Sequence, residues 1–116
     1  MPIPLEQRRC VRCEPGTPPL SHADVKPLLG QLQGWTLEEA DGHLRIAKRF
    51  KFKGFMPAVE FVNLIAPIAE AEGHHPDLLV SWGSVTVQLW THAAGGLTEN
   101  DFILAAKIDQ AYATKS

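Results

Sequence analysis

The sequence predicts an α+β domain in which three helices pack on one face of a four-stranded antiparallel sheet. Two pairs of short segments each enclose a tight turn, at Asp41-Gly42 and at Gly83-Ser84, and therefore predict two β-hairpins. Segments with apolar residues at helical spacing stand before, between and after these hairpins. The predicted order is α-β-β-α-β-β-α, and the other face of the sheet would meet solvent or a partner.

Composition indicates one globular domain and argues against several classes of protein. The chain of 116 residues is long enough for a single core, and its net charge of −2 disfavours binding to nucleic acid through phosphates. The sequence contains no run of about eighteen apolar residues, so it predicts no membrane span. Because residues 1–9 also lack the apolar region of a secretory signal, we expect a cytoplasmic protein.

Residues 1–20 are predicted to form a flexible Pro-rich arm, and residues 21–116 the folded domain. Five prolines stand in the arm, together with Cys10 and Cys13. A structural zinc ion needs four ligands, and the chain has no second cysteine pair. We therefore interpret both cysteines as free thiols, although a zinc ion shared by the pairs of two subunits stays open.

The first helix and the first hairpin follow the arm. Ser21 and Asp24 resemble a capping box at the start of the helix. The hairpin joins strands over residues 35–39 and 43–53, and in its second strand apolar even positions alternate with basic odd positions. Lys48 breaks this alternation, which suggests a bulge there.

The second helix is predicted over residues 55–72 and is apolar on more than one face. One stripe consists of Phe55, Val59, Val62, Ala66 and Ala69, and a second set of Phe61, Ile65 and Ile68 widens it. Such a helix usually meets a second surface, which in a domain this small would be another subunit. Pro67 lies inside the helix and predicts a kink.

The end of this helix is predicted to hold two histidines on a bend. Gly73 can adopt the left-handed conformation that ends a helix, and Pro76 forces His75 into an extended conformation. His74 and His75 therefore have little backbone freedom.

The second hairpin is predicted to bring a third histidine to the end of a strand. Its strands cover residues 78–82 and 85–91, and His92 follows directly. The third helix begins at Thr98, with Asp101 three residues later in a capping position.

Three of the five histidines thus cluster, which predicts chemistry. Histidine titrates near neutrality, and a helix C-terminus favours its charged form at His74 and His75, as does Glu70 one turn before His74. One protonated and one neutral imidazole would suit general acid–base catalysis. Three histidines could also bind zinc, but adjacent histidines seldom aim at one point, so we predict no metal. Capping or core packing is the remaining alternative for any single histidine.

The same residues resemble the signature of the pterin-4a-carbinolamine dehydratase family. The resemblance runs from about Leu20 to Tyr112 and leaves the cysteine arm outside. Its motif residues are Glu70-Ala71-Glu72-Gly73-His74-His75-Pro76, the aromatic Trp82, Thr91-His92 and Asp101.

The resemblance implies a hydro-lyase that removes water from a 4a-hydroxytetrahydropterin, such as 4a-hydroxytetrahydrobiopterin, to give quinonoid dihydropterin without metal or cofactor. By similarity His74 and His92 form the acid–base pair, and His75 binds and orients the pterin. The implied substrate-binding residues are His74, His75, Pro76, Thr91, His92, Ala93 and Ala94. Supporting roles fall to Glu70, Trp82 and Asp101, with Glu70 placed beside His74 as an orienting group.

The resemblance also implies partners and a rival function. Members form homodimers through sheet edges or homotetramers through the second helix, where Pro67 puts the tetramer in doubt. An aromatic amino acid hydroxylase would supply the substrate in a tetrahydrobiopterin recycling pathway. Some relatives instead act as binding proteins, either as dimerisation cofactors of a transcription factor or as Rubisco assembly factors, and the Rubisco type has lost the histidine signature. The complete signature favours the enzyme.

Overall fold

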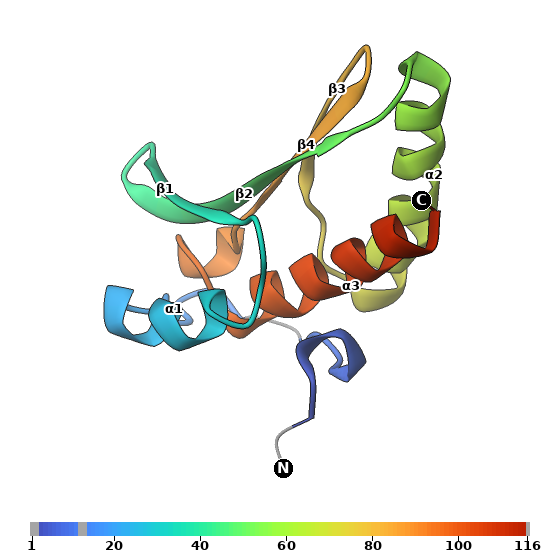
Figure 1. Cartoon of the computed structure of the whole chain (residues 1–116). Coiled ribbons are helices and arrows are strands. Elements are labelled where there is room, and N and C mark those ends of the chain that lie inside the picture. Colours follow the sequence, from blue (N-terminus) through green and yellow to red (C-terminus); the bar gives the residue numbers. More distant parts are fainter. Residues whose placement is uncertain (1–2, 12–13, 116) are drawn as a thin grey trace.

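The computed structural model describes residues 3–11 and 14–115, and only the backbone of Lys115. The chain folds in the predicted order, with two short 3-10 helices added (Figure 1). The elements are η1 (Leu5–Gln7), α1 (His22–Leu29), β1 (Thr36–Ala40), β2 (His43–Lys51), α2 (Phe55–Glu72), β3 (Asp77–Ser81), β4 (Ser84–Leu89), η2 (His92–Ala94) and α3 (Glu99–Lys115).

The two hairpins form one antiparallel sheet with the strand order β1-β2-β4-β3. β2 and β4 lie at its centre and pair from Ile46 opposite Leu89 to Lys51 opposite Ser84. The helices lie on one side of this sheet, and α3 runs beneath it (Figure 1). The predicted fold class is therefore confirmed.

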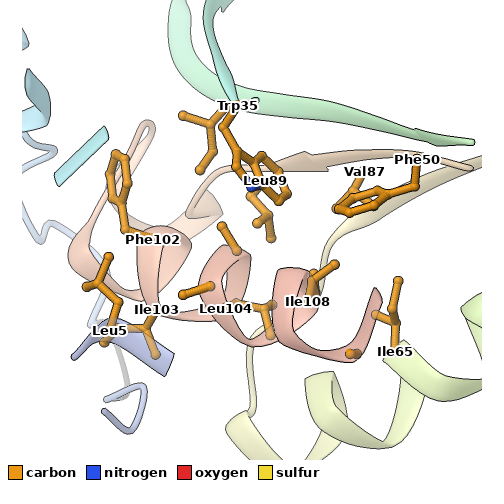
Figure 2. Close-up of a cluster of buried hydrophobic side chains, with 14 of the residues drawn as sticks. Leu5, Trp35, Phe50, Ile65, Val87, Leu89, Phe102, Ile103, Leu104 and Ile108 are labelled. Atoms are coloured by element: carbon orange, nitrogen blue, oxygen red, sulfur yellow. The ribbon is translucent and has the colours of Figure 1, made fainter. Parts of the chain in front are cut away.

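The core lies between the sheet and α3. Figure 2 shows Trp35, Phe50 and Leu89 reaching from the sheet side toward Leu104 and Ile108 of α3. Apart from Trp35, which keeps 6% of its surface exposed, these side chains are at most 1% exposed. Burying such a side chain contributes about 1.5–3 kcal/mol, so the contact between sheet and α3 stabilises the fold that carries the histidines.

Lys48 lies on the core side of β2 and forms no bulge. β2 pairs with β4 residue by residue through Lys48, so the predicted bulge is wrong. The Lys48 ammonium donates to Asp109 of α3 at 2.8 Å, and the Trp35 indole donates to the other oxygen of the same carboxylate at 2.9 Å. Because a carboxylate on α3 pairs with it, the lysine can occupy an inward position of the alternation.

α2 has the predicted bounds, and its core face includes residues from both of the predicted apolar sets. Its buried residues are Ala58, Phe61, Ile65 and Ala69, whereas 49% of Phe55 is exposed. The set that was expected only to widen the stripe thus contains the core residues Phe61 and Ile65. Since α2 is apolar on several sides, periodicity alone could not select the face. The helix continues through Pro67, which is exposed, to Glu72.

The described parts of the arm contact the domain. Leu5 in η1 is only 3% exposed and belongs to the core, and the amide of Leu20 donates to the Leu97 carbonyl at 2.8 Å. The division into an arm over residues 1–20 and a domain over residues 21–116 stays a prediction. Within the part of the chain that the structure describes, no helix is both long enough and apolar enough to cross a membrane.

Candidate active site

The bend between α2 and β3 carries His74 and His75. Gly73 ends α2 in the left-handed conformation, with φ of 64°, and the His74 amide donates to the Ala69 carbonyl at 3.2 Å. β3 begins at Asp77, which lies opposite Gln88 of β4. The register therefore places this bend at the same end of the sheet as the segment that follows β4.

His74 is paired with a buried aspartate on α3. Its Nε2 lies 2.6 Å from Oδ1 of Asp101, whose side chain is fully buried. The other oxygen of Asp101 accepts hydrogen bonds from the Thr91 hydroxyl at 2.8 Å and the Thr98 amide at 2.9 Å. A carboxylate held by these donors acts as the acceptor for Nε2–H of His74, which leaves Nδ1 of the imidazole for other chemistry.

A cavity of about 460 Å³ lies beside this pair. It is lined by Val11, Glu72, Gly73, His74, Thr91, Ala93 and Asn100. Its volume falls within the range of sites for small molecules. His74 is 11% exposed, so the imidazole is held by the protein and still borders open space.

Glu70 contacts His75 and not His74. Nε2 of His75 contacts Oε1 of Glu70 at 2.5 Å, and both side chains are largely exposed. Glu70 was expected to orient His74, but the structure pairs it with His75, and Asp101 takes the place beside His74. The two consecutive histidines are therefore each held by a carboxylate from a different helix.

His92 begins η2 and stacks on an aromatic side chain. Its ring centroid lies 3.8 Å from that of Trp90, and the other face of Trp90 stacks on His43 at 3.7 Å. Trp90 and His43 were not predicted to take part. The start of β2, where His43 lies, is next to the end of β4, which Trp90 follows. Their closeness depends on the register of the two strands, so the sequence alone did not reveal it.

The structure brings several predicted residues to the cavity and leaves others outside it. His74, Thr91 and Ala93 line it, and Asp101 stands behind His74. His75, Pro76, His92 and Ala94 flank these residues in the chain without lining it. Trp82 lies in the turn at the opposite end of β4 and is 76% exposed, so it is no part of this cavity. The predicted capping contact between Thr98 and Asp101 is present. Sequence reasoning missed Val11 and Asn100, and it named Glu72 only as part of the motif and not as a lining residue of the cavity.

Comparison with known proteins assigns the chain to a family. The model of the family described as pterin 4 alpha carbinolamine dehydratase matches residues 18–111. A protein of Rickettsia bellii, named as a pterin-4-alpha-carbinolamine dehydratase by inference, is 50% identical over 105 residues, which cover 90% of this chain and 91% of that protein. A protein of Alkaliphilus metalliredigens named in the same way is 46% identical over 107 residues, 91% of this chain and 94% of that protein.

The chain belongs to the pterin-4-alpha-carbinolamine dehydratase family.

Solved structures of two proteins share the fold of this family member. A transcriptional coactivator/pterin dehydratase of Brucella melitensis is 34% identical and superposes with a TM-score of 0.73, covering 81% of this chain and 98% of its own. A pterin dehydratase-like protein identified as a RuBisCO assembly factor in the alpha-carboxysome is 23% identical, with a TM-score of 0.58, covering 69% of this chain and 90% of its own. The second likeness concerns the fold alone.

The arm that precedes the family match borders the same cavity. Glu72 accepts a hydrogen bond from the Cys10 amide at 2.7 Å and forms an ion pair with Arg9 at 2.8 Å. Burial by itself would raise the pKa of Glu72, but the Cys10 hydrogen bond and the charges of Lys107 and Arg9 outweigh it, so the pKa is lowered. Glu72 is therefore a carboxylate that holds the arm.

Cys10 is a free thiol of low reactivity. Burial, reinforced by the charges of Glu72 and Asp101, raises the pKa of its thiol to about 12, so the thiol is protonated at neutral pH. Cys13 lies outside the described residues. Among residues 3–11 and 14–115, no three or more His, Cys, Asp or Glu side chains are grouped so that they could hold a metal ion.

Proposed function

We propose that this protein removes water from a 4a-hydroxytetrahydropterin and releases quinonoid dihydropterin, as 4a-hydroxytetrahydrobiopterin dehydratases do in tetrahydrobiopterin recycling. The observation that carries the proposal is the pairing of His74 with the buried Asp101 at the edge of a cavity of about 460 Å³. Membership of the dehydratase family supports the choice of substrate.

The proposed reaction needs an acid and a base and produces no net change in protons. The bond from C4a to its hydroxyl breaks while that oxygen receives a proton and leaves as water. N5 loses a proton, and the electron pair of its N–H bond forms the C4a–N5 double bond. One imidazolium and one neutral imidazole can carry out both transfers and exchange their protonation states.

His74 and His92 are proposed for these two transfers. Asp101 accepts from Nε2–H of His74, so Nδ1 is the nitrogen of this imidazole that would exchange a proton with the pterin. His92 is held by its stack on Trp90 and would supply the second group. His75, whose Nε2 contacts Glu70, would bind and orient the pterin from the other side of the bend. Pro76, Thr91, Ala93 and Ala94 would shape the surrounding surface.

A dehydration assay tests the proposal. We expect the purified protein to accelerate loss of water from a 4a-hydroxytetrahydropterin equally well before and after treatment with a chelator. His74→Ala and His92→Ala should each lower kcat by about 10²-fold or more, because a positioned acid or base typically contributes 10²–10⁴-fold. His75→Ala should act mainly on KM.

His22→Ala is the matched control, because His22 is an exposed histidine at the start of α1. It should leave kcat and KM unchanged, and circular dichroism should show that every variant is folded. Activity that disappears on chelation, or wild-type turnover in both the His74 and His92 variants, would contradict the proposed mechanism.

A further inference from the structure

We propose that Val11 forms an apolar lip at the mouth of the His74 cavity and contacts the pterin there, so that the arm before α1 helps to determine substrate affinity. This inference rests on the proposed dehydratase function. Val11 lines the cavity with His74, Thr91 and Ala93, although it lies before residue 18, where the family match begins.

The backbone of Val11 is fixed by a side chain of α3. Its amide donates to Oδ1 of Asn100 at 3.0 Å, and Nδ2 of Asn100 donates to the Val11 carbonyl at 2.5 Å. Asn100 is only 4% exposed. Both ends of a buried side-chain amide thus bind one residue of the arm, much as a neighbouring strand would.

A second attachment joins the arm to the bend that carries His74. Glu72, whose side chain is 6% exposed, binds the Cys10 amide and Arg9 and is followed directly by Gly73 and His74. Asn100, the first attachment, precedes Asp101 directly. The arm is therefore tied to the neighbours of both members of the His74–Asp101 pair, so the position of Val11 relative to His74 is set by short connections.

Val11 borders the cavity, and its side chain contributes little to the core. It is 70% exposed, although its backbone is held on two sides. Several other lining side chains are polar, including Glu72, Thr91 and Asn100. A 4a-hydroxytetrahydropterin is a bicycle whose edges carry most of its polar groups and whose faces are less polar, so polar groups suit its edges and an apolar lip suits a face.

Two substitutions of Val11 test this contact. Val11→Ala removes two methyl groups, and Val11→Ser removes them and adds a hydroxyl. We expect KM for the 4a-hydroxytetrahydropterin to rise by about twofold and about fivefold respectively, because less apolar surface leaves water on binding. The kcat should stay within about twofold of wild type, because Val11 is no part of the proton transfers. Thermal unfolding midpoints should not change, since the side chain is exposed.

Ile3→Ser is the matched control, because Ile3 is another exposed aliphatic residue of the arm and does not line the cavity. Its kcat and KM should equal those of the wild type. Asn100→Ala should raise KM as well, and combining it with Val11→Ser should add little, because both changes remove the same contact.

The outcomes separate this inference from the proposed function. If the wild-type protein dehydrates the pterin and both Val11 variants have an unchanged KM, the proposed contact of Val11 with the pterin is wrong and the proposed function is unaffected. Fully additive effects of Asn100→Ala and Val11→Ser overturn the role of Asn100 as the residue that positions Val11. A wild-type protein without dehydratase activity overturns the proposed function and the lip with it.

Discussion

At the scale of single residues, the candidate site depends on what stands behind each histidine. His74 is held by the buried Asp101, His75 by the exposed Glu70, and His92 by the ring of Trp90. A hydrogen bond to a buried carboxylate fixes both the orientation of an imidazole and the nitrogen that carries its hydrogen. A stacked ring fixes orientation alone. The three histidines are therefore constrained in different ways, and the pair with Asp101 is the most restrictive.

Substituting Asp101 tests that constraint. Asp101→Asn keeps the size of the side chain but no longer accepts a hydrogen bond at both oxygens, so His74 can rotate or change tautomer. We expect kcat to fall by about tenfold to a hundredfold while KM changes little. The measurement is a pH profile of kcat, which should also change shape because the proton transfers through His74 are affected.

Asp109→Asn is the control for structural damage. Asp109 lies two turns further along α3 and likewise accepts hydrogen bonds from a partly buried pair, Trp35 and Lys48. Both variants should lower the unfolding midpoint, since each disturbs a hydrogen-bonded carboxylate. An Asp109→Asn enzyme with the same loss of kcat as Asp101→Asn would show that the effect comes from stability and not from His74.

At the scale of elements, local sequence patterns predicted the helices, strands and turns. The features that they did not predict depend on contacts between elements that are distant along the chain. The turn at Asp41-Gly42 and the helix stop at Gly73 act within a few residues, so they could be read from the sequence. The inward position of Lys48 depends on Asp109, and the partner of His74 depends on α3, both of them far along the chain. One contact of the arm with α3 runs through Asn100, which no local pattern marks.

The attachment of the arm predicts an acid-sensitive contribution to stability. The pKa of Glu72 is lower in the folded protein than its ordinary value of 4.5, so the unfolded chain binds its proton more readily. The stabilisation is therefore complete above about pH 4.5 and is lost as the pH falls through the lower pKa of the folded state. Thermal unfolding followed between about pH 6 and pH 3 should show this loss.

Glu72→Gln should lower the unfolding midpoint at neutral pH and flatten its dependence on acid. Glu70→Gln is the matched control, because Glu70 lies two residues earlier on α2 and its side chain is 76% exposed. An exposed ion pair contributes little to stability, so the unfolding midpoint of this variant should fall with acid as that of the wild type does. Equal curves for wild type and Glu72→Gln would contradict the assignment.

At the scale of the whole molecule, α2 presents apolar surface that one subunit leaves uncovered. Met56 is 62% exposed and Leu64 is 39% exposed. A cavity of about 550 Å³ between α2 and α3 continues this surface along Leu64, Pro67 and Ile68. Apolar patches of this kind usually mark a contact with another protein, and a second copy of the chain is the partner that the composition of α2 predicts.

We therefore expect more than a monomer in solution, and light scattering after size-exclusion chromatography measures this directly. Leu64→Glu places a charge in the predicted contact and should reduce the molar mass of the assembly, because burying an unpaired carboxylate is costly. Ile3→Glu is the matched control, since it adds the same charge to an exposed aliphatic residue of the arm. A wild-type monomer at all concentrations would contradict the interpretation of α2. If Leu64→Glu leaves the assembly intact, the contact between subunits lies elsewhere. The edge strands β1 and β3 are then the candidates, because each has one unpaired side in the sheet.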